Sequence, residues 1–391
     1  MSRLLQRLFG RLPIGWLQLS HSKTRFAAAL AGVAFATLLV FMQLGMLGAL
    51  NSSTIAPYSF FEADIIISSE DANTLTDGSN VARSRLFQAL GVAGVASGTP
   101  LYIGNLDFQL DGGSTASLQT YALGGQGRAF VSPEIANQFN RLIPENTALI
   151  DTATRGVPAS AFDELRAGQP FWFEINGKTL TAVGTLAVGG GFSADGTLFV
   201  SDQTFLRFFS GRSSGAPNHI LLNVADGAEP RDVVARLRAI LPVESVKVQT
   251  LEEAANADLA YQTTERPTGI IFGFGVLIGI IVGIVIVYQV LSTDVADHLS
   301  EYATFKAMGY GQSFFLGIVF EEAIVLAVFG FIPGLLTSVL LYMGMSAATG
   351  LPVEMGFDRI LAVFVGTLVA CCISGAIATR RLAGADPADL F

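Results

Sequence analysis

The run Ile270-Ile-Phe-Gly-Phe-Gly-Val-Leu-Ile-Gly-Ile-Ile-Val-Gly-Ile-Val-Ile-Val-Tyr-Gln-Val-Leu291 decides the class of this protein, because it contains no Asp, Glu, Lys or Arg. A helix that crosses the hydrocarbon core of a bilayer needs roughly 20 mostly apolar residues, since its backbone polar groups must be satisfied inside the segment. Three further stretches meet this requirement, at 26–50, 314–341 and 360–378. The whole chain of 391 residues is 51% hydrophobic and only 14% charged, with a mean hydropathy of +0.52. The sequence therefore predicts a membrane protein with four spans.

Between the first two spans lies a segment of ordinary globular composition, residues 51–264, long enough for one large domain. It carries 13 Lys and Arg against 22 Asp and Glu, a net charge of −9, which disfavours binding to nucleic acid. Both cysteines, Cys371 and Cys372, fall in the fourth span, so the insertion has no thiols and cysteine usage does not reveal its compartment.

Basic residues near the spans indicate the orientation, because cytoplasmic flanks are enriched in Lys and Arg. The first 25 residues hold five basic residues and no acidic one, and Arg380 and Arg381 follow the fourth span. We therefore expect both termini in the cytosol and the insertion outside. Arg3, Arg7 and Arg11 recur every four residues, which predicts an amphipathic helix on the inner membrane surface; the alternative is a basic tail that only sets the topology.

The ends of the insertion predict two β-α-β units, at 61–68, 81–90 and 92–103, and at 219–224, 229–240 and 245–249. Because the chain must leave and re-enter beside its spans, these ends should pack as one α/β subdomain. The middle is expected to form a second, β-rich subdomain, with a hairpin around Asn176-Gly177.

The expected fold is an α-helical membrane protein with four transmembrane helices and a large α+β extracytoplasmic domain inserted between the first and second. The predicted segments are 1–25 (basic, cytoplasmic), 26–50 (span 1), 51–264 (outer domain, with β-α-β-like ends 51–105 and 215–264 and a β-rich middle 106–214), 268–292 (span 2), 293–312 (cytoplasmic coupling helix), 313–346 (span 3), 347–359 (short outer loop), 360–379 (span 4) and 380–391 (cytoplasmic tail).

The sequence contains no phosphate-binding loop and no cluster of His or Cys typical of a metal site. The nearest approach to a phosphate-binding Gly-x-x-x-x-Gly-Lys loop is Gly177-Lys178-Thr179, but Trp172 stands where the first Gly is required. The three His are scattered and the insertion has no Cys, which argues against a metal site built from those residues, and no cofactor is expected. An enzyme that uses two of the 22 outer acids stays open, but the chain is not predicted to be an enzyme. Any ATP and Mg²⁺ chemistry belongs to another polypeptide.

The predicted cytoplasmic loop carries a functional signal. From Asp294 to Met308 the apolar residues follow helical spacing, with Asp in the first turn, Lys in the last and Gly after it, which predicts a helix of about four turns. A helix this short is marginal alone in water and must bury its apolar stripe. We predict that it docks another protein; the alternative is a linker helix resting on its own bundle or on lipid head groups. The predicted contact residues are Asp297, Leu299, Glu301, Tyr302, Phe305, Lys306, Met308 and Gly309.

The third span contains two further features. Glu321 and Glu322 would be unfavourable against hydrocarbon, so they either mark the water boundary or contact the coupling helix or a neighbouring subunit. Pro333 should break or kink this helix. In the second span, Gly-x-x-x-Gly repeats beginning at Gly269 predict close pairing with a helix of the same chain or of a second copy.

One span, a large outer insertion and three more spans, with an inner helix that ends in Lys306-Ala-Met-Gly309 and is followed by Glu322-Ala323, resemble the MacB/FtsX family of ABC permeases. The stretches Pro13-Ile-Gly-Trp16 and Phe41-Met-Gln-Leu-Gly45 and the closing Asp386-Pro-Ala-Asp-Leu-Phe391 are similar to cyanobacterial DevC-type permeases. The middle of the insertion shows little resemblance beyond the general layout.

This resemblance implies the permease subunit of an ABC-type exporter in the bacterial inner membrane. It implies a homodimer, a separate cytosolic ABC ATPase docked at the inner loops, and an outer domain bound to a periplasmic membrane-fusion adaptor and an outer-membrane channel. It further implies tripartite efflux by mechanotransmission in contact with membrane lipid, with export of lipid or glycolipid. The alternatives are an FtsX-like signal transmitter that activates a cell-wall hydrolase, and a lipoprotein extractor. A membrane-anchored receptor without an ATPase would leave the inner helix unexplained.

Overall fold

A computed structural model of the protein describes residues 14–109, 115–157, 159–175, 177–187, 191–192, 194–298, 301, 304–306 and 308–379. The chain forms two compact units. We call them the helical unit (Met1–Gly48, Ile271–Gly344 and Val353–Phe391) and the sheet domain (Ala49–Ile270 and Met345–Pro352). The predicted surface helix with Arg3, Arg7 and Arg11, and the basic pair Arg380 and Arg381, lie outside the described residues.

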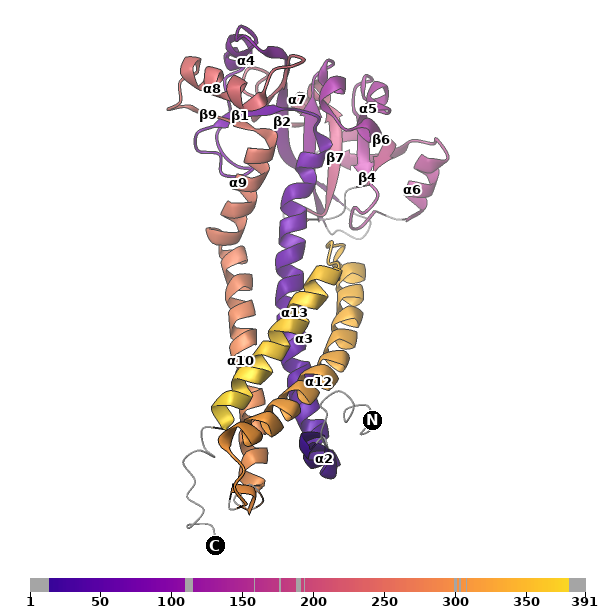
Figure 1. Ribbon diagram of the computed structural model, residues 1–391. Helices are drawn as coiled ribbons and strands as arrows, with labels where there is room; N and C mark the ends of the chain where they lie inside the picture. Colours follow the sequence, from indigo (N-terminus) through magenta and orange to yellow (C-terminus); the bar gives the residue numbers. More distant parts are fainter. Residues whose placement is uncertain are drawn as a thin grey trace. The chain divides into compact units, whose positions relative to one another are not determined.

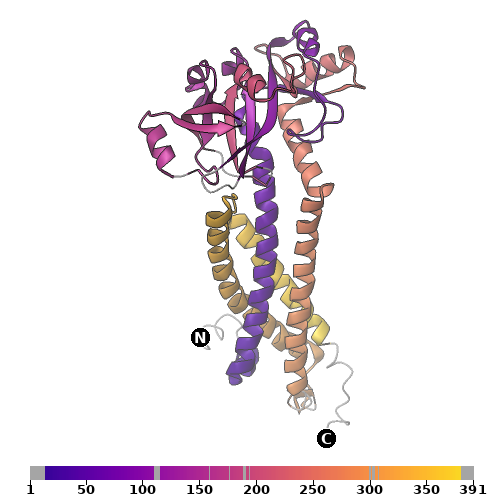
Figure 2. The same ribbon diagram turned by 180° about the vertical axis from the view of Figure 1, so that it is seen from behind.

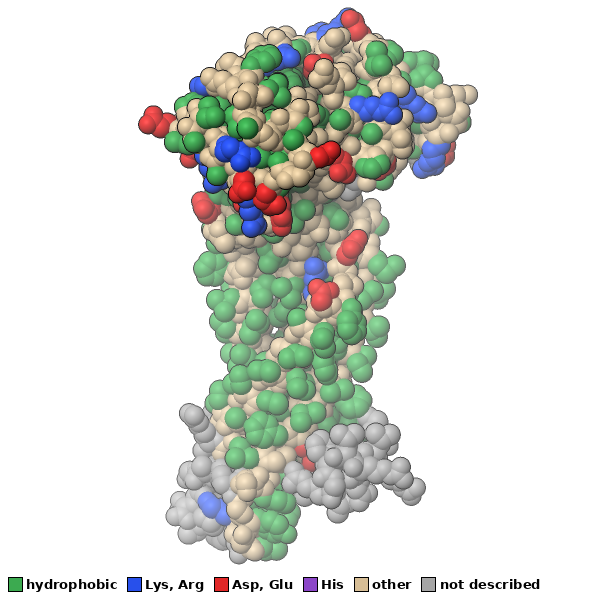
Figure 3. Space-filling model, turned by 45° about the horizontal axis from the view of Figure 1, so that its top comes forward, with side chains coloured by type: hydrophobic (Ala, Val, Ile, Leu, Met, Phe, Trp, Pro, Cys, Tyr) green, Lys and Arg blue, Asp and Glu red, His purple; other side chains and the backbone are tan. Residues whose placement is uncertain are grey.

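Four helices among the described residues are long and apolar enough to cross a membrane, which confirms the predicted number of spans. They are α3 (Lys23–Ile55), α10 (Pro267–Asp297), α12 (Gln312–Thr349) and α13 (Phe357–Ala378), and the short α2 (Ile14–His21) precedes them. Hydrophobic side chains cover the visible surface of the membrane helices, whereas most of the charged ones gather on the sheet domain (Figure 3).

Two helices continue five residues beyond their predicted ends. Helix α3 was expected to end at residue 50 but continues to Ile55, where a 3₁₀ turn (Ala56–Phe60) begins with Pro57 as its second residue. Helix α10 was expected to end near 292 but continues to Asp297, because no Gly or Pro interrupts the sequence there.

The sheet domain contains a nine-stranded sheet in the order β5-β6-β4-β7-β3-β2-β8-β1-β9 (Figure 1). Its strands are β1 (Ile65–Ser69), β2 (Val95–Gln109), β3 (Thr115–Leu123), β4 (Thr147–Asp151), β5 (Phe171–Ile175), β6 (Lys178–Leu186), β7 (Gly196–Ser201), β8 (His219–Val224) and β9 (Val246–Thr250). Its helices are α4 (Ser84–Leu90), α5 (Pro133–Ala136), α6 (Ala159–Arg166), α7 (Asp202–Phe208), α8 (Pro230–Ile240) and α9 (Leu251–Thr264), with 3₁₀ turns η2 (Gly127–Phe130) and η3 (Phe139–Leu142).

The two ends of the insertion interleave in one half of this sheet. Strand β8 pairs antiparallel with both β1 and β2, and β1 pairs antiparallel with β8 and β9. The units β1-α4-β2 and β8-α8-β9 are therefore split β-α-β units, each with a strand of the other between its own two. Because both units share hydrogen bonds, neither can form its half of the sheet alone.

The middle of the insertion extends the same sheet, which differs from the expected separate subdomain. Strand β2 runs to Gln109, beyond the predicted end at 103, and pairs with β3 from Leu101↔Leu123 to Gln109↔Thr115. Strand β3 then pairs in parallel with β7. The long strand β2 thus joins the two halves through continuous backbone hydrogen bonds.

Both faces of the sheet are covered where the insertion's ends meet. Ile65 and Ile67 of β1 pack in a cluster with side chains of α4 and α8, while Ile66 faces the other cluster, which includes Ala254 of α9. This alternation follows from the two-residue period of a strand. Figure 2, seen from behind, shows α9 continuing from the edge of the sheet toward α10.

Candidate functional site

The predicted coupling segment begins as the last turn of α10 rather than as a separate helix. Asp294 and Asp297 belong to α10. Leu299 and Tyr302 lie outside the described residues. Met308 and Gly309 follow the helical residues 304–306, and Gly309 has a φ of +93°, the left-handed conformation that ends a helix.

Of the contact residues predicted there, Phe305 and Met308 face different surroundings. Phe305 packs at 5.7 Å from the Tyr310 ring and 5.8 Å from the Phe314 ring, and it contacts the core of the helical unit. Met308 is 61% exposed, and Lys306 is also exposed. The segment therefore uses one apolar side chain to hold its own position and leaves another on the surface.

Glu321 is buried inside the helical unit instead of facing lipid. Its carboxylate Oε1 lies 3.4 Å from the backbone N–H of Trp16, in the first turn of α2. N–H groups in the first turn of a helix have no partner within the helix and carry partial positive charge, so a carboxylate there is stabilised. The hydrogen bond from Trp16 to Glu321 therefore links α2 to α12.

Glu322 is fully buried beside Asp294 of α10, and the two carboxyl groups interact. Neither oxygen of Glu322 accepts a hydrogen bond from a nitrogen or hydroxyl donor in the described part of the chain. Gly15 of α2 is packed against it: a Cβ on Gly15 would lie 2.9 Å from Glu322 Cγ. The structure thus places Glu322 against α10 just where the predicted coupling segment starts.

Ion pairs and a hydrogen bond join α2, α3 and the α10–α12 connection at the surface of the helical unit. Arg25 at the start of α3 forms an ion pair with Asp297. The Gln18 side chain donates to Glu301 at 3.4 Å, and His298 lies 3.1 Å from the other oxygen of Glu301. Residues 16–25 and the described part of the α10–α12 connection are therefore linked by side-chain contacts. We call these residues the inner junction, after the side of the membrane on which the sequence predicts them.

Pro333 was predicted to break or kink α12. The helix is continuous through Pro333, so it does not break there, and Figure 1 shows it changing direction along its length. Around Pro333 the helix packs tightly on α3. A Cβ on Gly334 would lie 2.8 Å from the carbonyl oxygen of Ala34, and one on Gly330 would lie 2.6 Å from Val33. Close approach of the two backbones depends on these glycines.

The glycine repeat in α10 also finds a partner within the chain. Positions for a Cβ on Gly279 and on Gly283 lie 3.2 Å from Val40 and Ala36 of α3. Gly273 has open space around it.

In the sheet domain, buried polar residues hold the segment 70–80, which we call the strap. The backbone N–H of Leu75 donates to Asp258 Oδ2 at 2.9 Å, and Tyr58 donates to the same oxygen at 3.1 Å. His219 Nε2 lies 2.8 Å from the carbonyl oxygen of Leu75, and His219 Nδ1 lies 2.8 Å from Ser68 Oγ. Because a carbonyl only accepts, Nε2 carries the proton and Nδ1 accepts from Ser68.

The burial of these groups shifts their titration. Burial raises the pKa of Asp258 to about 6, against the hydrogen bonds from Leu75 and Tyr58 that favour the carboxylate. Burial lowers the pKa of His219 to about 4. Arg266 forms an ion pair with Asp77 of the strap at 2.8 Å.

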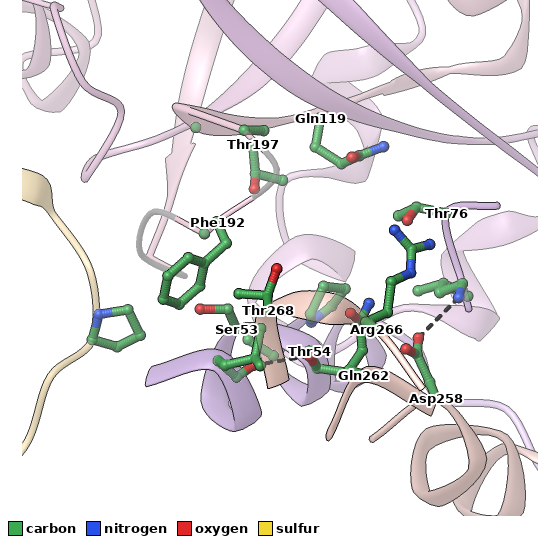
Figure 4. Close-up of a pocket in the computed structure, with 18 of the residues that line it drawn as sticks. Ser53, Thr54, Thr76, Gln119, Phe192, Thr197, Asp258, Gln262, Arg266 and Thr268 are labelled. Carbon is green, nitrogen blue, oxygen red and sulfur yellow. Dashed lines mark hydrogen bonds between the residues drawn. The ribbon is translucent and has the colours of Figure 1, made fainter. Parts of the chain in front are cut away.

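A cavity of about 380 Å³ lies beside the strap, within the sheet domain. It collects side chains from the end of α3, from β3 and β7, from α9, and from the residues at the start of α10 (Figure 4). Its polar lining includes Ser53, Thr54, Gln119, Thr197, Asp258 and Arg266.

The sequence did not indicate Asp258 or His219 as special. Asp258 is one of 22 acids in the insertion, and His219 is one of three scattered histidines. Its position at the start of an apolar strand, His219-Ile-Leu-Leu, was a usable signal, because a histidine buried in a strand needs polar partners. Among the described residues, no three His, Cys, Asp or Glu side chains come together as a metal site would require.

Comparison with known proteins finds a family match for the last three long helices. Residues 273–387 match the family described as FtsX-like permease C-terminal. This match covers α13 and α12, almost all of α10, and the inner connection between α10 and α12. Residues 273–387, less than half of the chain, are thus similar to an FtsX-like permease C-terminal domain, a family of transmembrane subunits of ABC transporters.

Among solved structures, the chain is similar to the periplasmic region of MacB from Actinobacillus actinomycetemcomitans (12% identity, 51% of this chain and 93% of that one, TM-score 0.33). It is also similar to the extracellular domain of the transporter YknZ from Gram-positive bacteria (9%, 48% and 98%, 0.34) and to a domain of a putative permease from Porphyromonas gingivalis (12%, 50% and 89%, 0.27). These TM-scores are too low to establish a shared fold. No curated protein matches the chain.

Proposed function

We propose that this chain is the membrane-spanning subunit of an ABC-type export system that couples a separate cytosolic ATPase to the sheet domain. The observation that carries the proposal is the FtsX-like permease match over residues 273–387, which includes the inner connection. The exposed Met308 and Lys306 on that connection give an ATPase an apolar contact next to a charge.

The proposed orientation has the inner junction in the cytosol and the sheet domain outside. Met345–Pro352, the last turn of α12 and the first residues of the connection to α13, belongs to the same compact unit as the insertion between α3 and α10. Both connections then lie on one side of the membrane, and the α10–α12 connection lies on the other. Arg25 and Lys23 at the start of α3 agree with a cytosolic inner junction.

In the proposed mechanism, movement of the ATPases shifts α10 at the inner junction and reaches the sheet domain through α9, which precedes α10 in the chain. This mechanotransmission needs no substrate path through the four helices. A homodimer, a periplasmic adaptor and an outer-membrane channel complete the proposed assembly, with lipid or glycolipid as cargo.

The test is affinity purification of the tagged chain in mild detergent, followed by identification of every co-eluting protein. An ATPase together with a periplasmic adaptor is the expected result. An ATPase with a cell-wall hydrolase would instead show a signal transmitter, and an ATPase with a soluble lipoprotein carrier would show an extractor. Absence of any ATPase would overturn the proposal.

A further inference from the structure

The loop that connects α7 to β8 in the sheet domain, residues 209–218, is held beside β2 and the segment that precedes α4. The backbone N–H of Arg83 donates to the carbonyl oxygen of Gly215 at 2.8 Å. The hydroxyl of Tyr102 in β2 donates to the carbonyl oxygen of Ser214 at 2.7 Å. These two bonds fix the loop next to Arg83 and Tyr102.

The same loop carries a second arginine, Arg212, whose guanidinium group is held in place. Its Nη2 donates to Oδ1 of Asn218, and its Cζ lies 5.8 Å from the centre of the Phe205 ring. Burial lowers the pKa of the Arg212 guanidinium group, because burial penalises the charged form. Arg212 is therefore a positioned, partly desolvated cation.

Arg83 and Arg212 lie near one another, beside the phenol group of Tyr102. Burial raises the pKa of Tyr102, and the positive charges of both arginines oppose that rise. Charges act on a buried group in this way only at short range. Together with the hydrogen bonds of the loop, this places two cations at one position on the sheet domain.

No acidic side chain in the described ranges forms an ion pair with either arginine. The Nε atoms of Arg83 and Arg212 are both buried and have no acceptor among the residues that the structure describes. Burial raises the pKa of the nearby Asp202, and the charge of Arg83 opposes that rise, but the two groups do not pair. A partly buried cation without a counter-charge is unfavourable. The position therefore lacks a negative charge.

The geometry of the two arginines favours one class of anion. Because both Nε atoms are covered by protein, an anion must approach the Nη nitrogens. Two guanidinium groups can donate to different oxygens of one tetrahedral dianion, whereas a carboxylate is already satisfied by a single arginine. The exposed Ser213 and Ser214 add hydroxyl groups to the same loop. The charge and the number of donors thus fit a phosphate group.

We propose that Arg83 and Arg212 form a binding site for a phosphate group on the sheet domain. The ligand is inorganic phosphate or a phosphate monoester, since both present the same dianionic, tetrahedral group. This inference goes beyond the proposed function, and it depends neither on the orientation of the chain nor on an ATPase.

The test is equilibrium dialysis of the full-length chain in detergent against radiolabelled inorganic phosphate. The ionic strength is kept constant, because salt screens the attraction between the arginines and the anion. Saturable binding of one phosphate per chain is expected. Arg83→Met and Arg212→Met should each weaken binding by about tenfold or more, since each removes hydrogen bonds to a charged group.

Arg85→Met is the matched control. It removes the same charge two residues from Arg83, but the Arg85 guanidinium group donates to Gln88 at 2.8 Å instead of facing Tyr102. An exposed charge outside the site should change the affinity by less than about threefold. Equal weakening by Arg83→Met and Arg85→Met, or no saturable binding to the natural protein, would overturn the site.

Two milder variants keep the test valid if a Met variant fails to fold. Arg212→Lys retains the charge without the planar fork, so it should bind phosphate with an affinity between those of the natural protein and Arg212→Met. Asp202→Asn removes a negative charge beside the site and should tighten binding. Weaker binding by Asp202→Asn would contradict the placement of the phosphate group near Arg83.

Competition experiments identify the ligand. Acetate that displaced the labelled phosphate as well as unlabelled phosphate does would overturn the assignment of a tetrahedral dianion. Displacement by glycerol 3-phosphate at a lower concentration than by unlabelled phosphate would identify a monoester as the ligand, and displacement at a higher concentration would identify phosphate itself. Either of these two results supports the site.

Discussion

Carboxyl groups lie near both ends of the second span, but the two units surround them differently. Asp258, on the helix that precedes α10, accepts hydrogen bonds from Leu75 and Tyr58. Glu322, beside Asp294 at the end of α10, receives none from nitrogen or hydroxyl donors in the described part of the chain. Asp258 Oδ2 accepts both of these bonds although Oδ1 has no partner in the described part of the chain, whereas neither oxygen of Glu322 accepts one. A buried polar group is held more rigidly when more of its hydrogen bonds are formed. We therefore predict that the segment around Asp258 is held firmly and that the end of α10 beside Glu322 rearranges when a partner binds.

The largest effect should come from the surface of the inner junction. Met308→Glu is expected to abolish ATPase docking, because burying an unpaired charge in the contact would weaken binding by about 100-fold or more. Co-purification of the ATPase measures this, with Met308→Leu as the control of similar size and apolar character. Retained docking in the Glu variant would place the contact elsewhere. A loss in both variants would mean that the shape of Met308, rather than its polarity, matters.

Asp258 and His219 should have opposing effects on how the stability of the sheet domain depends on pH. The folded-state pKa of Asp258, about 6, exceeds its usual 3.8, so its contribution to stability falls as the pH rises from 4 to 6. The pKa of His219 is about 4 instead of 6.5, so its contribution rises with pH over nearly the same window. Each effect amounts to about 3 kcal/mol over its whole range. They should nearly cancel in the natural protein.

Replacing one residue at a time should reveal the opposing contributions of Asp258 and His219 to stability. In Asp258→Asn, the free energy of unfolding of the sheet domain should increase with pH between 4.5 and 6, and in His219→Gln it should decrease. Hydrogen exchange of β1 and β8 amides in the full-length chain measures both slopes. If both variants kept the flat profile of the natural protein, the strap would not be held by these two groups.

Within the helical unit, a substitution that disturbs the packing of α12 on α3 should have the next largest effect on thermal stability. Gly334→Leu must displace the backbone of α3, because its Cβ would already lie 2.8 Å from the carbonyl oxygen of Ala34. Overpacking of this kind destabilises by about 1–3 kcal/mol. Gly344→Leu is the matched control, since nothing lies within 4 Å of that position. Thermal unfolding in detergent should separate them, and equal midpoints would contradict the close α3–α12 contact.

The sequence was most informative where structure is determined locally. Four apolar runs predicted four spans, and Asn176-Gly177 between two short β-rich segments predicted the hairpin of β5 and β6. The sheet order could not be predicted in the same way. Strands β3 and β7 pair in parallel although more than 70 residues separate them, and no local pattern encodes such a contact.

The candidate sites show the same limit. The spacing from Asp294 to Gly309 indicated a helix and its end, but could not show that Phe305 packs inward while Met308 stays exposed. For Glu321 and Glu322, the cost of a carboxylate in lipid predicted either the water boundary or a contact with the coupling helix or a neighbouring subunit. It did not name α2 or Asp294 as the partner. Asp258 became distinguishable only when the fold brought it next to Leu75.

The smallest effects should come from the two exposed ion pairs, and they refine the comparison between the ends of α10. Asp297→Asn removes the pair with Arg25, whose side chain is 67% exposed, so the loss should stay below about 1 kcal/mol. Asp77→Asn should have a larger effect than Asp297→Asn, because the side chains of Arg266 and Asp77 are 41% and 32% exposed, less than those of Arg25 and Asp297 at 67% and 40%, so their ion pair is screened less by solvent. Proteolysis of the strap and of the inner connection in the two variants measures the difference. A larger effect at Asp297 would reverse the ranking and make the inner end of the second span the more firmly held one.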